Sequence, residues 1–247
     1  MQAVKGQAIM KKTLALGLAL ILIAALCCCK SREKSDDASG NEANKTQATK
    51  SLPIDAALPP VKVNYTEKNS GRVFIRIPQV SGTSFDANIN SAIMTAADRL
   101  SQENESSGIS LDYFVGYNAN GIFSVYLSVS SNTLVIDHAA LTFNVASGER
   151  IALGDLFTEP WQERLLALVN AAAFSESVNL ISEITEIDDK DFYLSGQSLF
   201  VLYDLYEVSD YDAGALTFEV EYSRIADIAS SKSAIAVIQA ASSQNEM

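Results

Sequence analysis

"ISLDYFVGYNANGIFSVYLSVSSNTLVIDHAALTFNV", residues 109–145, is the stretch of sequence that decides the fold. Apolar and polar residues alternate along much of it, as they do in strands that bury one face. We predict strands over residues 109–117, 122–130 and 134–145. The first two are joined at 118–121, where Asn and Gly accept positive backbone φ angles. Consecutive strands joined by short turns predict an antiparallel sheet.

The sequence before residue 109 predicts a hairpin and a helix. Residues 61–65 and 73–77 alternate as strands do, and Asn69-Ser70-Gly71 between them is typical of a hairpin turn. Residues 84–102 predict an amphipathic helix with Ser84 as its N-cap. Its apolar residues recur at helical spacing: Phe85, Ile89, Ile93, Ala96 and Leu100.

The sequence after residue 145 again predicts both helices and strands. A turn at 146–149 leads to a short apolar segment, and residues 159–174 predict the strongest helix, with Pro160 near its start and Trp161 on its apolar face. Further strands are predicted at 192–194, 199–203 and 216–222, and a short helix at 224–229. Strand pairs interrupted by helices, without regular βαβ alternation, predict an α+β fold with a mainly antiparallel sheet and two principal packing helices.

The N-terminus has the pattern of a secretory signal peptide. Lys11 and Lys12 precede an apolar run over 13–26, which is too short for an ordinary membrane-spanning helix and ends in three cysteines. Leu26 and the residues after it resemble a bacterial lipobox, in which a cysteine receives diacylglycerol. We favour Cys29 as the acylated residue, with Cys28 as the alternative, and Met10 as the start of translation. An uncleaved N-terminal anchor remains the other interpretation.

The rest of the chain is predicted to form a tether, a folded domain made of two halves, and a tail. Residues 30–60 are polar, nearly free of large apolar residues and closed by two prolines, which is typical of a flexible tether. We predict an extracytoplasmic domain over 61–230, made of two closely packed halves, 61–130 and 131–230. Residues 231–247 are predicted to be a C-terminal tail.

The folded part of the chain is strongly acidic. Residues 51–247 carry 10 Lys and Arg against 26 Asp and Glu, a net charge of −16, whereas residues 1–50 hold eight basic and four acidic residues. Such a domain repels nucleic acid and anionic lipid, so no nucleic acid is expected as a partner. The negative electrostatic field of such a domain would speed its encounter with a cationic partner. A need for solubility alone would also explain such a charge.

The residue types needed for common catalytic and metal sites are nearly missing. All three cysteines lie at 27–29, and the chain has one histidine, His138. This excludes a Cys-His dyad and multi-histidine zinc sites, and no cofactor or metal is predicted. His138 follows Asp137 in a predicted strand, so their side chains should point to opposite faces, and we interpret His138 as structural. A pair of carboxylates for glycoside hydrolysis stays open, because its separation is spatial.

One segment is unusually rich in both tyrosine and carboxylate. "YDLYEVSDYDAGALTFEVEY", residues 203–222, has no histidine, cysteine or lysine, and therefore does not look like an active site. Exposed tyrosines would supply contact area to a partner, and the acids would steer a cationic one. We predict a partner-binding surface here, and we also hold open that the acids form an ordinary solvated loop. Its residues are Tyr206, Glu207, Asp210, Tyr211 and Asp212.

Two stretches, 141–157 and 191–225, resemble a bacterial extracytoplasmic domain of unknown function. That domain occurs in RsiV-type anti-sigma factors and beside the catalytic domain of PdaC-type peptidoglycan deacetylases, and residues 61–130 resemble the domain that commonly precedes it. The positions that carry the resemblance are Gly148, Leu153, Asp155, Leu156, Phe157, Tyr206, Glu207, Tyr211 and Gly214. The chain departs from the pattern at 137–139, at Asn144 and at Asp210, where a proline is frequent, and it lacks the sigma-binding and deacetylase parts.

The resemblance implies an envelope-facing binding domain, because the RsiV-type member uses this domain to bind lysozyme, a strongly basic protein. We therefore expect a lipid-anchored protein of the bacterial cell envelope, periplasmic or surface-exposed. Its domain would bind a cationic protein such as lysozyme, or a cell-wall ligand such as peptidoglycan, without catalysis. The alternatives are a carboxylate-based glycan-active enzyme and a purely structural envelope lipoprotein.

Overall fold

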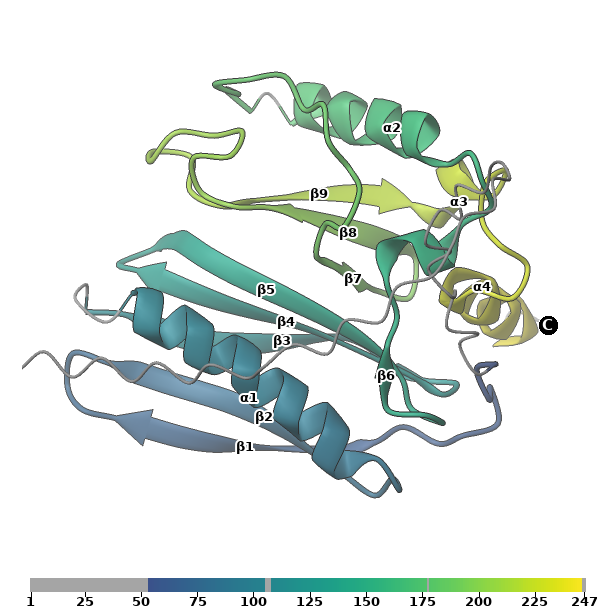
Figure 1. Ribbon diagram of the computed structural model, residues 1–247, viewed down its shortest axis with the longest axis horizontal. Helices are drawn as coiled ribbons and strands as arrows, with labels where there is room; N and C mark the ends of the chain where they lie inside the picture. The colour runs from purple at the N-terminus through teal and green to yellow at the C-terminus, as the bar shows by residue number, and fades with distance from the viewer. Residues whose placement is uncertain (1–52, 105–107, 177, 246–247) are drawn as a thin grey trace, which may run out of the picture. The chain divides into compact units, whose positions relative to one another are not determined.

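The computed structural model describes residues 53–104, 108–176 and 178–245, which all lie within one compact unit of the chain. Within these residues there are two mainly antiparallel β-sheets and four α-helices (Figure 1), which confirms the predicted α+β class. The predicted signal peptide, Cys28, Cys29 and most of the tether lie outside the described residues. No helix in the described part of the chain is both long and apolar enough to cross a membrane.

The larger sheet has six strands in chain order. All neighbours are antiparallel except β2 and β3, which are parallel and are joined through helix α1 (Asp86–Glu103). The strands predicted over 109–145 agree with β3, β4 and β5 to within two residues at each end, and Gly121 in the turn has the expected positive φ of 75°. The strands are β1 (Lys62–Asn69), β2 (Phe74–Ser81), β3 (Ser110–Ala119), β4 (Ile122–Ser131), β5 (Leu134–Asn144) and β6 (Glu149–Arg150).

Helix α1 covers one face of this sheet and forms the first hydrophobic core with it (Figure 1). Its buried residues Ile89, Ile93, Ala97 and Leu100 recur every three or four positions, so they share one side of the helix. The predicted N-cap Ser84 is wrong, because Phe85 stands at that position without a side-chain cap. Instead, the carboxylate of Asp86 accepts hydrogen bonds from the backbone N–H groups of residues 82 and 83, at 3.0 and 2.9 Å.

The smaller sheet has three strands, β7 (Phe192–Leu194), β8 (Ser198–Tyr203) and β9 (Leu216–Glu221). Helix α2 (Gln162–Ser175) lies against it, after a short 3-10 helix at Leu153–Leu156. Together they enclose the second hydrophobic core, which includes the only tryptophan of the chain. Buried residues of this core include Trp161, Leu165, Val169, Leu199, Val201, Phe218 and Val220.

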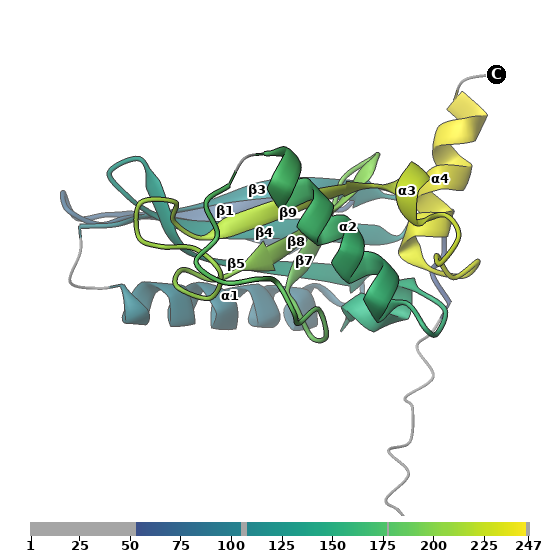
Figure 2. The same ribbon diagram turned by 90° about the horizontal axis from the view of Figure 1, so that it is seen from above.

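The C-terminal segment is a helix and not the predicted tail. Helix α4 (Ala234–Asn245) lies beside the short helix α3 (Tyr222–Ile225) (Figures 1 and 2), and its residues Ala234, Ile235 and Ile238 are buried in the second core. The hydroxyl of Ser233 accepts a hydrogen bond from the backbone N–H of Ala236 at 3.4 Å, as an N-cap does. Ser233 followed by closely spaced Ile residues was the local signal for this helix.

The predicted boundaries at both ends of the first half also need correction. A division at residue 130 would separate β4 from β5, although these strands pair along almost their whole length. The first core draws its buried residues from 61–145, and apart from Ile122 of β4 the buried residues of the second core all come after β5. Residues 53–60, which we assigned to the tether, are packed in part, with Ile54 against the second core and Leu58 against the first.

The two sheets meet where β7 lies against β3, β4 and β5. The hydroxyl of Ser124 on β4 accepts a hydrogen bond from the backbone N–H of Leu194 at 2.9 Å, and Ser124 also bonds to Thr142 at 2.8 Å. Gly116 on β3 lies so close to β7 that an added Cβ would stand 2.4 Å from the carbonyl oxygen of Leu194. This contact packs β7 against the middle of the larger sheet, whereas a separate hydrogen bond from the backbone N–H of Ala215 to the carbonyl of Val135 ties the segment before β9 to the start of β5.

Candidate partner-binding site

The loop between β8 and β9, residues 204–215, contains all five residues that the sequence predicts for partner binding. We call it the acidic loop. Val208 and Ser209 are buried, and the Ser209 hydroxyl donates a hydrogen bond to the carbonyl of Gly214. The backbone N–H of Ala215 donates to the carbonyl of Val135 at 2.9 Å. The acidic loop is therefore tied internally and to the start of β5.

Tyr206 and Tyr211 present their rings to solvent. Their exposed fractions are 62% and 51%, so neither side chain contributes to a core. Tyr206 also has a positive φ of 67°, which is uncommon for a residue with a Cβ. Two exposed aromatic rings held on an anchored loop are the kind of side chains that serve as anchors in protein interfaces.

Glu207 is used within the protein. Its carboxylate forms a partly buried ion pair with the ammonium of Lys190 and accepts a hydrogen bond from the backbone N–H of Asp204 at 3.0 Å. Lys190 also lies over the ring of Tyr203, with 4.9 Å from its Nζ atom to the ring centroid. Glu207 thus shapes the acidic loop, and its charge is already compensated.

Asp210 and Asp212 lie at the tip of the acidic loop and are exposed. The carboxylate of Asp210 accepts a hydrogen bond from the backbone N–H of Ala213 at 3.2 Å. Neither carboxylate forms an ion pair with any residue that the structure describes. Both therefore remain available to a cationic group from outside.

The structure adds acidic residues to this site that the sequence analysis did not select. Asp204 begins the acidic loop, while Asp137 on β5 and Asp191 before β7 lie near it. The pKa of Asp204 is raised, first by desolvation and then by the charges of Asp137, Glu207 and Asp191, while the charge of Arg99 partly opposes the shift. We call these four carboxylates the acidic cluster. They come from three separate parts of the sequence, so no local pattern marks them as a group.

His138, which we interpreted as structural from the sequence, is buried in the domain. Its side chain is only 1% exposed, and its Nδ1 atom lies 3.3 Å from the hydroxyl of Tyr126. Burial lowers its pKa to about 4, so the imidazole is neutral at pH 7, although the carbonyl of Tyr203 partly opposes this shift. Asp137 points to the other face of β5, where it accepts a hydrogen bond from Asn104 of the α1 end, so it does not partner the imidazole.

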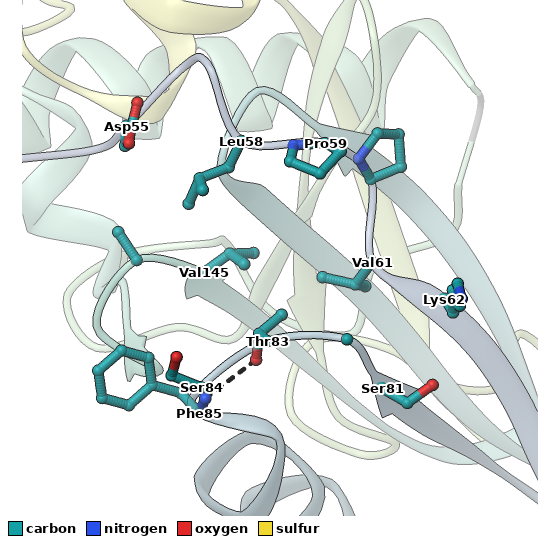
Figure 3. Close-up of a pocket in the computed structure, with 13 residues that line it drawn as sticks. Asp55, Leu58, Pro59, Val61, Lys62, Ser81, Thr83, Ser84, Phe85 and Val145 are labelled. Atoms are coloured by element: carbon teal, nitrogen blue, oxygen red, sulfur yellow. Dashed lines mark hydrogen bonds between the residues drawn. The ribbon is translucent and has the colours of Figure 1, made fainter.

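A separate pocket lies at the beginning of the folded region, away from the acidic loop in sequence. Its volume is about 600 Å³, and it is formed by Asp55 and by residues 58–62, 81–85 and 145–146 (Figure 3). Leu58, Val61 and Val145 contribute its apolar side chains, together with the ring of Phe85. Asp55 and Lys62 are its only charged residues, so the pocket offers no pair of carboxylates for acid–base chemistry.

Aromatic side chains also gather on the sheet faces opposite the helices. Phe114 on β3 is 57% exposed and meets Tyr193 of β7 at 6.2 Å between ring centroids, and Tyr193 stacks on Phe200 at 4.5 Å. On β1, Tyr65 is 52% exposed and lies under the guanidinium of Arg76. We call Phe114, Tyr193 and Phe200, whose rings contact one another in succession, the aromatic face. Exposed aromatic groups of this kind mark binding surfaces more often than isolated apolar residues do.

Similarity to known proteins is found in the structure and not in the sequence. No protein-family model matches the sequence, and no curated protein shows significant similarity to it. The structure is similar to the crystal structure of a DUF3298 family member from Bacteroides fragilis NCTC 9343, with a TM-score of 0.51, 11% identity, and 76% of this chain and 99% of that chain covered. A DUF3298 family protein from Pseudomonas aeruginosa PAO1 aligns with a TM-score of 0.48 and 12% identity over 71% and 96% of the two chains.

DUF3298 is the extracytoplasmic domain present in RsiV-type and PdaC-type proteins, so the resemblance described from the sequence is supported by the structure. At 11% identity the similarity extends to the fold and not to particular side chains. The chain thus has the fold of a DUF3298 protein.

Proposed function

We propose that this protein is a lipid-anchored component of the bacterial cell envelope whose folded domain binds a cationic protein, such as lysozyme, without catalysis. The anchor rests on the lipobox pattern that ends at Cys29. Mass spectrometry of the intact chain tests it, since acylation of Cys29 would add lipid and the preceding 28 residues would be absent. A chain that keeps residues 1–9 and carries no lipid would contradict the anchor.

The acidic loop carries the binding part of the proposal. It combines two exposed tyrosines, Tyr206 and Tyr211, with the carboxylates of Asp210 and Asp212, which form no ion pair with a described residue. Aromatic rings supply the area that a protein interface needs, while carboxylates on its rim mainly accelerate association with a cationic partner. The net charge of −16 for residues 51–247 supports the same class of partner. Lysozyme is the partner that the resemblance to the RsiV-type domain implies.

Binding of the full-length chain to lysozyme over a salt series tests this function. We expect saturable binding that persists near 0.15 M salt, where charges more than about 8 Å apart are largely screened. Tyr206→Ala should weaken binding about tenfold, as the loss of one aromatic anchor does. Asp210→Ala and Asp212→Ala should mainly slow association, by about twofold each.

Tyr65→Ala is the matched control, because Tyr65 is similarly exposed but lies on β1, outside the acidic loop. It should bind lysozyme within about twofold of the unmodified chain. Binding that disappears at 0.15 M salt would reflect general charge attraction and would contradict the proposal. So would equal losses in the Tyr206 and Tyr65 variants.

A cell-wall ligand is the second candidate, and the aromatic face favours it. Aromatic rings on an open sheet surface can stack on flat apolar faces of a ligand, and Arg76 and Asp112, which pair at 2.7 Å, supply polar groups nearby. Cosedimentation with insoluble peptidoglycan distinguishes the two candidates. An accompanying assay for peptidoglycan turnover separates both from the glycan-active enzyme, because neither involves cleavage.

A further inference from the structure

Asp204 is the one member of the acidic cluster that has no basic side chain of its own. Within the described residues, Asp137 lies 3.7 Å from Arg99, Asp191 lies 3.2 Å from Arg150, and Glu207 pairs with Lys190. No Lys or Arg of that part of the chain lies within 4.0 Å of the Asp204 carboxylate, whose side chain is 70% exposed. Within the described residues the cluster therefore sets four carboxylates against three basic side chains, and the charge of Arg99 only partly opposes the raised pKa of Asp204.

A second observation points to the same place. The Nε2 atom of His138 is buried and forms no hydrogen bond of normal geometry within the described residues, although the carbonyl of Tyr203 acts on the ring, and it lies 3.6 Å from Oδ1 of Asp204. A buried polar atom without a partner is costly in a folded protein, so its position usually has a reason. Here the imidazole lies behind the free carboxylate and leaves the opposite side of that carboxylate open to solvent.

We propose that Asp204, with His138 behind it and the rest of the acidic cluster around it, is a binding site for one cationic side chain of a partner protein, the ammonium of Lys or the guanidinium of Arg. This proposal rests on the proposed function and names the group that the domain would bind. A single positive charge would compensate the excess negative charge of the cluster. A multiply coordinated metal ion fits less well, because no three His, Cys, Asp or Glu side chains in the described residues are placed to hold one.

The partner must supply the cation because the neighbouring basic residues are engaged elsewhere. Arg99 donates hydrogen bonds to Glu103 at 2.8 Å and to the carbonyl of His138 at 3.0 Å. Lys190 is held by Glu207 and the ring of Tyr203. Tyr206, two residues after Asp204, is exposed and could pack along the aliphatic part of a bound Lys or Arg side chain.

The only histidine of the chain makes this site directly measurable. The imidazole signals of His138 in the full-length chain can be followed by NMR at pH 7 during titration with N-acetyl-arginine amide and N-acetyl-lysine amide. The ring is neutral at this pH because its pKa is lowered to about 4, so the signals report the nearby charge and not titration of the ring. We expect a saturable shift with both cations and none with the neutral N-acetyl-citrulline amide.

Asp204→Asn removes the charge and keeps the shape of the side chain. We expect it to abolish the saturable shift and to weaken lysozyme binding about fivefold, the size expected for one partly desolvated ion pair. Asp227→Asn is the matched control, because Asp227 is 60% exposed and already pairs with Arg164 at 3.3 Å. It should leave both measurements unchanged. Equal melting temperatures of the two variants would show that folding is intact.

The outcomes separate this site from the proposed function. If no saturable shift occurs in the unmodified chain, or if Asp204→Asn retains it, the cation site is overturned. If lysozyme binds but Asp204→Asn and Asp227→Asn bind it equally, the site is overturned while the function stands. If the arginine and lysine probes bind at Asp204 but lysozyme does not, the site stands and lysozyme is the wrong partner.

Discussion

Replacing Gly116 with alanine is expected to destabilise the protein by about 3 kcal/mol, the cost of overpacking at a close backbone contact. The added Cβ would stand 2.4 Å from the carbonyl oxygen of Leu194 and 2.8 Å from the ring of Tyr193. Backbone cannot move aside as a flexible side chain can, and β7 is also held by the hydrogen bond from Leu194 to Ser124. Urea unfolding followed by circular dichroism measures this loss.

Gly196→Ala provides the control for the Gly116 variant. Gly196 lies in the turn before β8, and a Cβ there would meet nothing within 4 Å. Its substitution should change the free energy of unfolding by no more than about 0.5 kcal/mol, or should stabilise the protein slightly by restricting the unfolded chain. If Gly116→Ala were as stable as Gly196→Ala, the close contact between β3 and β7 would be wrong.

Phe143→Ala is expected to have the largest effect, a loss of about 4 kcal/mol, because it opens a cavity in the first core. Phe143 on β5 is fully buried and stacks on Phe123 of β4, with ring centroids 6.4 Å apart. Phe174→Ala is the control, since the ring of Phe174 is 87% exposed and contributes little burial. Both variants can be compared with the unmodified chain by urea unfolding.

The Phe143 variant also tests whether the two cores unfold together. Trp161, the only tryptophan, lies in the second core, while Phe143 lies in the first. Because β5 contacts α1 and also β7, we expect the transition seen by Trp161 fluorescence to shift as much as that seen by circular dichroism. A shift in circular dichroism alone would show that the cores unfold separately.

Much of the local structure follows from short-range patterns. The alternation along residues 109–145 predicted β3, β4 and β5, and Asn118–Gly121 predicted the turn between the first two. These features could be predicted because a strand repeats every two residues and a tight turn restricts backbone angles at fixed positions. Helix α4 was missed, although Ser233 and the spacing of Ile235 and Ile238 pointed to it, because the segment has many small residues and few charges.

The acidic loop could be located from sequence, but the roles of its residues could not. Glu207 appeared free to bind a partner, yet its charge is compensated by Lys190, which lies 17 residues earlier in the chain. Asp204 was not selected, because its surroundings depend on Asp137 of β5 and on Asp191 before β7, which are distant from it in sequence. An ion pair depends on distance in space, and sequence separation carries no information about that distance.

The sequence by itself determined the α+β class, the central antiparallel strands and the acidic character of the domain, because periodicity and charge are local or additive properties of the residues. Only the tertiary structure decided how β7 meets β3 and β4 at Gly116 and which carboxylates are paired. It also decided that Asp204 lies beside the buried His138, with no Lys or Arg of the described residues within 4.0 Å. These properties arise where segments distant in the chain come into contact, so close packing and desolvation, and not local pattern, set them.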